Sequence, residues 1–201
     1  FNAMVSQRGV INLYHSDAQR DAYTRRGNAM RLHGVDADLL NRDQVREKLP
    51  FLDYDNARFP IMGGLMQARG GTVRHDAVAW GFARGADQNG VDIIQNCEVT
   101  AIDRDGDQIT GVQTTRGAIK CGKLAMAVAG SSSHVAQMVD MRLPIESHAL
   151  QAFVSEGLKP FIDTVVTFGA GHFYVSQSDK GGLVFGGDIE GYNSYAQRGN
   201  L

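Results

Sequence analysis

A histidine behind a glycine-rich loop is the residue of this sequence best placed for chemistry. His75 follows Gly70–Gly71 in the stretch from Ala68 to Trp80. Apolar residues then recur at every fourth position, at Val78, Phe82 and Ala86. This spacing predicts a helix that has Thr72 as its N-cap and ends at the pair 89–90. His75 therefore falls in the first turn, where free backbone N–H groups and the helix dipole disfavour a second positive charge.

A histidine in this position is expected to stay largely neutral near neutral pH, because its reference pKa is about 6.5. Arg74 acts in the same direction and Asp76 opposes it. Only a neutral ring nitrogen acts as a nucleophile, so one interpretation of His75 is an attachment point for a cofactor. The other interpretation is a surface or capping histidine without chemistry, and position alone favours that one.

Composition limits the partners that this chain is expected to have. A formal net charge of -2, with 20 Lys and Arg against 22 Asp and Glu, provides no basic field for nucleic acid. The longest apolar run, 124–129, is far shorter than the roughly 18 residues of a membrane helix. No secretory signal is visible. With 43% hydrophobic residues in 201, the chain is expected to bury a sizeable core in one domain or two interleaved ones.

The two cysteines and the other histidines point away from metal chemistry. Cys97 and Cys121 have neither metal-ligand spacing nor a disulfide framework, and both lie in strand-like segments. We therefore expect buried thiols in a reducing cytoplasm. The remaining histidines share no ligand spacing, so no metal site is expected.

The first part of the chain contains the elements that must position His75. A strand is predicted over 5–14, then a helix that Ser16 caps and Gly34 ends, and a short helix from Asn41 to Pro50. The segment 59–71 contains two glycine pairs and is expected to form strand edges and loops where backbone approaches a ligand closely.

The second part of the chain is predicted to be mainly strands. They are expected at 91–94, 98–102, 108–115 and 118–128, with turns at 104–107 and 116–117. Segment 127–133 is then predicted to end a strand and begin a helix, with serines placed to cap it. Such a turn often contacts a phosphate group, but it is also common in α/β proteins without that role. Further strands are expected at 149–154, 173–177 and 183–185, with a turn at 179–182. A mixed parallel and antiparallel α/β class follows.

Several short sequence motifs resemble, in the same order, those of the beta subunits of heterotetrameric sarcosine oxidases, which are flavoproteins of the D-amino-acid-oxidase-like superfamily. They are Ser6–Val10, Gly34–Ala37, Arg74–Asp76, Gly90–Thr100, Leu143–Ile145 and Tyr192–Asn193. The resemblance implies a FAD-dependent oxidoreductase fold of mixed α+β and α/β class, with a mixed flavin-binding sheet, helices and an antiparallel substrate-side sheet.

The resemblance also implies a division of the chain into three segments. Residues 1–65 would supply substrate-side strand and helices, 66–142 part of the flavin-binding domain, and 143–201 the antiparallel substrate-side sheet. The family's subunit is longer and begins with a dinucleotide-binding unit. We therefore expect this chain to be a central fragment of such a subunit.

For His75 the resemblance implies a covalent bond to the 8α-methyl group of FMN. Where family members have a second histidine two positions later, this sequence has Ala77. Val73 and Arg74 adjoin the attachment point and are expected to contact the FMN. Arg69 and Arg74 are candidates for the FMN phosphate, because guanidinium donors suit phosphate oxygens, and Arg74 is the nearer of the two.

For FAD, which the family binds without a covalent bond, the resemblance implies Val99. Its backbone N–H and C=O would contact the adenine, while its side chain is that of a core valine. The strand end before Gly130 would lie beside the FAD, and His172 and Tyr174 are weaker candidates to face the flavin ring. The family's carboxylate-gripping residues lie outside these 201 residues, so no catalytic residue is assigned.

The implied activity is the oxidation of sarcosine, or a similar N-methyl amino acid, to an imine at FAD. Electrons would pass to FMN and then to oxygen, forming hydrogen peroxide. The expected partners are the other sarcosine oxidase subunits, chiefly alpha, which in the family handles tetrahydrofolate and NAD.

Two alternatives stay open. One is a related FAD-dependent amine or amino-acid dehydrogenase. The other, for these residues alone, is a flavin-free, non-catalytic module that self-associates through exposed sheet edges.

Overall fold

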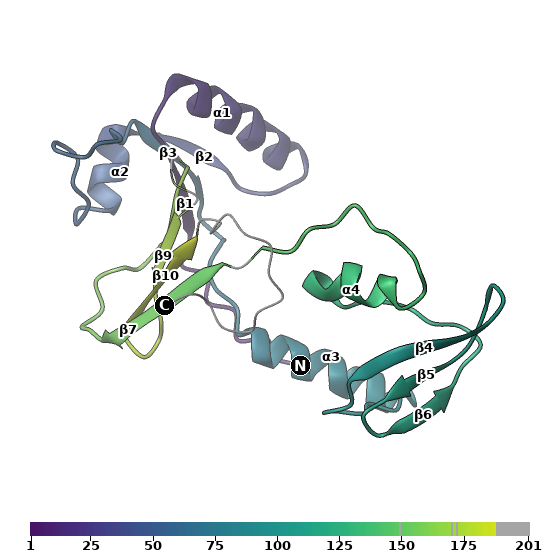
Figure 1. The fold of residues 1–201 in the computed structure, drawn as a ribbon. Helices are drawn as coiled ribbons and strands as arrows, with labels where there is room; N and C mark the ends of the chain where they lie inside the picture. Colours follow the sequence, from purple (N-terminus) through teal and green to yellow (C-terminus); the bar gives the residue numbers. More distant parts are fainter. Residues whose placement is uncertain (149, 170, 172, 188–201) are drawn as a thin grey trace. The chain divides into compact units, whose positions relative to one another are not determined.

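The computed structural model describes residues 1–148, 150–169, 171 and 173–187. Two compact units divide the chain, one from residues 1–82 and 150–188 and the other from 83–149 and 189–201. Figure 1 shows the elements of both units.

The first unit is built on a seven-stranded mixed sheet of order β2-β3-β1-β8-β9-β10-β7. Its strands are β1 (Val10–Tyr14), β2 (Asp38–Asn41), β3 (Gly63–Gln67), β7 (Gln151–Gly157), β8 (Val165–Phe168), β9 (Phe173–Gln177) and β10 (Gly182–Gly187). β1 and β8 pair in parallel, and the other neighbours pair antiparallel. Strands from the beginning and the end of the described chain therefore share one sheet, and the mixed class is confirmed.

Two helices flank the β2–β3–β1 end of this sheet (Figure 1). Helix α1 (Asp17–Leu32) begins after Ser16, whose hydroxyl accepts a hydrogen bond from the backbone N–H of Gln19 at 3.3 Å, as the sequence predicts. Helix α2 (Arg42–Lys48) begins with a capping box in which Asn41 and Gln44 each accept a hydrogen bond from the other's backbone. Both predicted starts are confirmed.

The strands of this unit differ from the prediction in their limits and in their number. β1 begins at Val10 rather than Val5, because Gly9 has a φ of 84° and interrupts the extended chain. β7 and β10 both extend further toward the C-terminus than the predicted strands 149–154 and 183–185. The sequence does not predict β2 or β8, which form through pairing with β3 and with β1 and β9.

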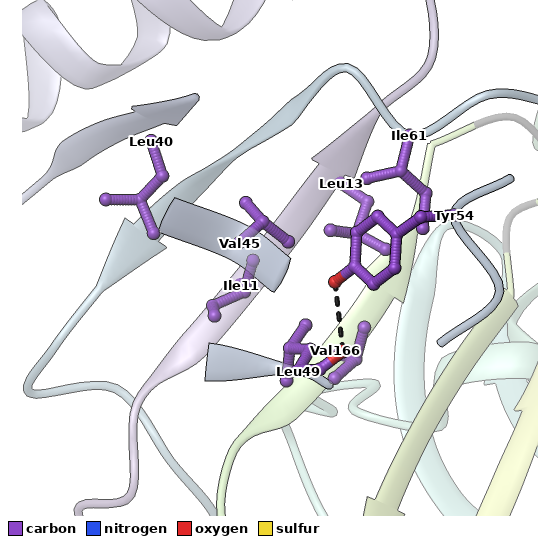
Figure 2. Packing of buried hydrophobic residues seen from close by; sticks show 8 residues of the cluster. All are labelled: Ile11, Leu13, Leu40, Val45, Leu49, Tyr54, Ile61 and Val166. Atoms are coloured by element: carbon purple, nitrogen blue, oxygen red, sulfur yellow. Dashed lines mark hydrogen bonds between the residues drawn. The ribbon is translucent and has the colours of Figure 1, made fainter. Parts of the chain in front are cut away.

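The core of the first unit lies between α2 and the sheet (Figure 2). It comprises Ile11, Leu13, Leu40, Val45, Leu49, Tyr54, Ile61 and Val166. The Tyr54 hydroxyl, though buried, donates a hydrogen bond to the Leu49 carbonyl oxygen at 3.0 Å. Each such aliphatic side chain contributes about 1.5–3 kcal/mol when it leaves water, so this cluster sets the stability of the unit that carries His75.

A glycine inside this core provides the first testable prediction. A Cβ at Gly63 would overlap the Tyr14 hydroxyl and the Leu40 carbonyl oxygen, which hydrogen-bond each other at 3.0 Å. Gly63→Ala should therefore destabilise the protein by about 2–3 kcal/mol in urea unfolding. Gly122→Ala is the matched control, since a Cβ there meets nothing within 4 Å. Equal stability of the two variants would contradict the packing described for β3.

The second unit contains a three-stranded antiparallel sheet of order β4-β5-β6. Its elements are β4 (Val99–Asp105), β5 (Gln108–Thr114), β6 (Gly117–Lys120), the short 3-10 helix η1 (Ala129–Ser131) and α4 (Ser132–Gln137). Gly106 and Gly117 have φ values of 59° and 111°, which suits glycine in tight hairpins. Both predicted turns are confirmed.

Two predicted strands of this unit are wrong. Residues 91–94 and 121–128 form no strand, although both segments are rich in apolar residues. A strand persists only where a neighbouring strand shares its hydrogen bonds. In the described part of the chain, Cys121 still donates to the Thr110 carbonyl at 3.2 Å, and no strand pairs with 91–94 or 122–128. Their apolar side chains are exposed at Val91, Ile93, Ile94, Leu124, Met126 and Val128.

The cysteine prediction is also corrected. Cys97 precedes β4 and Cys121 follows β6, so neither lies in a strand. Both are free thiols and half-buried rather than buried. Each cysteine lies just outside a strand end, where the neighbouring residues cover its side chain only partly.

Candidate functional site

The segment that carries His75 starts helix α3 (His75–Gln88). Thr72 is not its N-cap, because the backbone of Thr72 exchanges hydrogen bonds with that of Ser6 at 2.8 and 3.0 Å and lies in a β-bridge. The other end of the helix is as predicted. Gly90 has a φ of 80°, and the N–H of Val91 donates to the Ala86 carbonyl.

The His75 side chain is exposed on the first residue of this helix. In the part of the chain that the structure describes, no hydrogen bond or ion pair engages its ring. Its nitrogens are therefore open to a ligand, as covalent attachment requires. An exposed histidine at a helix start is equally compatible with the alternative of a residue without chemistry. Val73, also exposed, lies two residues before it.

Arg74 and Asp76 form a bidentate ion pair beside His75. The guanidinium Nε and Nη2 donate to the two carboxylate oxygens of Asp76 at 3.0 and 2.7 Å. These hydrogen bonds lower the pKa of Asp76 to about 2 and raise the pKa of Arg74, with a smaller contribution from Asp179. One edge of the guanidinium is thus engaged, and the Nη1 side keeps donors that suit a phosphate.

The pH dependence of this ion pair can be tested by Asp76→Asn. Because the pKa of Asp76 in the folded protein lies below its ordinary value of 3.8, the carboxylate stabilises the folded protein above about pH 4. That contribution is lost as the pH falls from about 4 to about 2. The melting temperature of Asp76→Asn should therefore lie below that of the unaltered protein at pH 6 and converge with it near pH 2. A constant difference across this range would contradict the pairing.

The loop before His75 is anchored from the N-terminal segment. The N–H of Gly9 donates to the Gly70 carbonyl at 2.8 Å, and that of Arg74 to the Ala3 carbonyl at 3.3 Å. The Nη2 of Arg8 donates to the carbonyl of Gln177 at 2.9 Å and lies 3.4 Å from the Thr72 hydroxyl. The sequence analysis did not identify Arg8 as a candidate, although Arg8 lies within the motif at residues 6–10.

Arg69 forms an ion pair of the same kind. Its Nε is 2.5 Å from one carboxylate oxygen of Asp36, and its Nη2 is 3.1 Å from the other. Both arginines thus use Nε and Nη2 for a carboxylate and keep the Nη1 side for other acceptors. The ion pairs do not distinguish the two candidates for the FMN phosphate, and Arg74 differs only in adjoining His75 in the sequence.

In the second unit, Val99 is the half-buried first residue of β4. Within the described residues β4 is an edge strand, so its outer edge leaves backbone N–H and C=O groups without a ladder partner. Such an edge suits backbone contacts to an adenine.

The turn at 129–133 differs from its prediction. A 3-10 turn precedes α4, and the Ser131 N-cap makes no side-chain hydrogen bond. The hydroxyls of Ser132 and Ser133 instead donate to the carbonyls of Ala129 and Ile145 at 2.6 and 2.7 Å. The predicted serine cap is therefore wrong, since these hydroxyls act as donors to carbonyl groups.

Of the two weaker flavin-facing candidates, only Tyr174 is described. It is half-buried on β9, and its hydroxyl lies over Gly186 of the adjacent β10, where a Cβ would come within 3.3 Å of it. His172 and the motif at residues 192–193 lie outside the described residues.

The described residues contain no group of three or more His, Cys, Asp or Glu side chains that could hold a metal ion. None of their helices is long and apolar enough to cross a membrane.

The FAD dependent oxidoreductase family model matches residues 1–200. The chain belongs to this family. It is 81% identical over 201 residues to the sarcosine oxidase subunit beta of Rhizobium meliloti (strain 1021), and 50% identical over 200 residues to that of Arthrobacter sp. These matches cover 100% and 99% of the chain but 48% and 49% of the relatives, so the chain spans about half their length.

Solved structures of other proteins share the fold. L-proline dehydrogenase from P. horikoshii matches with a TM-score of 0.81 and 24% identity, over 96% of this chain and 51% of that one. Glycine oxidase from Geobacillus kaustophilus matches with a TM-score of 0.73 and 18% identity, over 98% and 51%. The predicted fold class is confirmed.

Proposed function

We propose that the full-length protein is the beta subunit of a flavin-dependent oxidase of sarcosine or a similar N-methyl amino acid. The observation that carries this proposal is the 81% identity to a sarcosine oxidase subunit beta along all 201 residues. Family membership adds FAD as the cofactor.

The residues present fit the two flavins. The unpaired outer edge of β4 offers the Val99 backbone to the adenine of FAD. Exposed His75 offers a ring nitrogen for a covalent bond to FMN, beside Val73 and the open side of Arg74. When bound, FAD supplies the oxidation of the N-methyl amine to an imine, and FMN supplies the route of electrons to oxygen, with hydrogen peroxide as the product.

This chain's own part in the reaction is positioning. The hydrogen bonds from residues 3–9 to residues 70–74 hold the start of α3, and with it the backbone that carries the His75 ring. The Arg74–Asp76 ion pair occupies one edge of the guanidinium and directs its remaining donors outward. The proposed partners are the other oxidase subunits, chiefly alpha, and the proposed location is the cytoplasm.

The test uses the full-length subunit coexpressed with its partner subunits. In the absence of oxygen, sarcosine should reduce the flavin almost completely, seen as loss of its visible absorbance. D-alanine and L-proline should not reduce it. Admission of oxygen should restore the colour with formation of hydrogen peroxide. Bleaching by D-alanine or L-proline in preference to sarcosine would overturn the proposed substrate.

A second candidate is a related amino-acid dehydrogenase. It is favoured by a weaker similarity, 30% identity over 139 residues, to the D-amino acid dehydrogenase of Cereibacter sphaeroides (strain ATCC 17029 / ATH 2.4.9). Reduction of the flavin by D-amino acids, with little reoxidation by oxygen, would support this alternative. For the 201 residues alone, a colourless, self-associating preparation would indicate a flavin-free module.

A further inference from the structure

The loop before His75 pairs with the N-terminal segment. The pairing of β1 with β3 ends at Val10, and an isolated bridge between Ser6 and Thr72 lies beyond it. Residues 3–9 and 70–74 form this extension, the His75 ribbon. In the described part of the chain, hydrogen bonds between backbone groups join residues 3–8 only to residues 72–74. The backbone therefore joins these two halves of the ribbon to each other and does not link them to the sheet.

The side chain of Arg8 joins the His75 ribbon to strand β9. Its Nη2 donates to the Gln177 carbonyl at 2.9 Å and lies 3.4 Å from the Thr72 hydroxyl. Gln177 ends β9, and Thr72 lies three residues before His75. The carbonyl of Arg8 accepts from the Thr164 hydroxyl at 3.1 Å, which fixes the backbone from which the side chain extends. One guanidinium group thus contacts both the sheet and the loop that carries His75.

The acceptor of Arg8 on β9 is itself held firmly. The Gln177 residue is 3% exposed. Its Oε1 accepts from the backbone N–H groups of Phe161 and Ile162. Its Nε2 donates to the Gly181 carbonyl at 2.9 Å. Because both ends of this buried amide are bonded, the carbonyl of Gln177 is a rigid anchor for the guanidinium.

Packing alone does not explain a guanidinium at position 8. Arg8 is half-buried, and its Nε is buried without a hydrogen-bond partner among the described residues. An unpaired buried donor lowers stability. A methionine would fill a similar space without this cost, so the contribution of the arginine lies in its Nη2 contacts with Gln177 and Thr72.

We propose that Arg8 is a positioning residue for His75, whose guanidinium ties the His75 ribbon to β9 and so sets where the His75 ring meets FMN. This role rests on the proposed covalent attachment of FMN. A covalent bond forms only while the reacting atoms are held in contact, and a displacement of about 1 Å can slow a reaction about 100-fold. The Arg8 link gives the ribbon one position relative to the sheet, which its own backbone pairing does not.

Hydrogen exchange of the full-length subunit, coexpressed with its partners, tests this link independently of flavin. Arg8→Met keeps a stem of similar length and removes the donors, so exchange of the Thr72 and Arg74 amides should rise about tenfold or more. Amides of α1 should keep their rates, because the effect is local. Arg8→Lys restores a donor and should return most of the protection. Arg25→Met is the matched control, since Arg25 is exposed on α1, and it should change neither amide.

Covalent flavin is the second readout. The denatured Arg8→Met band should retain at least about threefold less flavin than the unaltered chain, and Arg8→Lys should recover most of it. Unchanged exchange or unchanged covalent flavin in Arg8→Met would overturn the proposal, and so would equal effects of Arg8→Met and Arg8→Lys, which would indicate packing alone. If the unaltered chain holds no covalent flavin, the proposed attachment fails and the role toward FMN with it, whereas raised exchange in Arg8→Met would still establish the link to β9.

Discussion

Replacing His75 by alanine should remove all covalently held flavin from the full-length subunit. After coexpression with its partners and denaturation, the unaltered chain should keep flavin fluorescence in its protein band, and His75→Ala should show none. The reason is chemical: a covalent bond from the ring nitrogen survives denaturation, whereas hydrogen bonds from Arg74 and its neighbours do not. Non-covalent FAD, extracted before denaturation, should be unchanged.

The control for this experiment is His33→Ala, another exposed histidine of the same unit. It should retain covalent flavin at the level of the unaltered chain. Flavin that stays with the His75→Ala band would disprove attachment at this residue. If the unaltered chain retains no flavin after denaturation, His75 is a surface histidine without a cofactor. The proposal is then reduced to a FAD-dependent amine oxidoreductase without covalent FMN.

Replacing Gln177 by leucine should cause the largest loss of stability among these variants, about 3–5 kcal/mol. Gln177 is 3% exposed, and its Oε1 accepts from the backbone N–H groups of Phe161 and Ile162 at 2.8 and 3.1 Å. Its Nε2 donates to the carbonyl of Gly181 at 2.9 Å and of Lys159 at 3.1 Å. Leucine fills a similar volume but leaves these groups unpaired, at about 1–3 kcal/mol for each buried one.

Urea unfolding of the full-length protein measures this loss. Gln7→Leu is the matched control, because Gln7 is exposed, and its stability should stay within about 0.5 kcal/mol. Because Gln177 joins loop 158–162 to the turn 178–181, its loss should also speed proteolysis there. A Gln177→Leu variant within about 1 kcal/mol of the unaltered protein would show that water replaces the amide.

Elements with local signals were predictable from the sequence. Ser16, Asn41 and Gly90 mark helix limits through hydrogen bonds or backbone angles that involve only a few neighbouring residues. Hairpin turns at Gly106 and Gly117 have the same local origin. The Thr72 cap failed because its backbone pairs with Ser6, far away in the sequence.

The roles of His75, Arg74 and Val99 stay predictions from the resemblance to a family, while their contacts came from the structure alone. It shows that His75 is exposed and that Arg74 is paired with Asp76. The engagement of Arg69 by Asp36 spans 33 positions and has no local signal. Arg8 was missed for the same reason.

The sequence by itself determined the family, the helix starts and the tight turns, since these depend on residue types and short spacings. Tertiary structure decided which of the less distinct apolar segments form strands: β8 forms because β1 and β9 flank it, while segments 91–94 and 122–128 have no described strand to pair with. Pairing and burial depend on residues distant in the chain, and no short window of sequence records them.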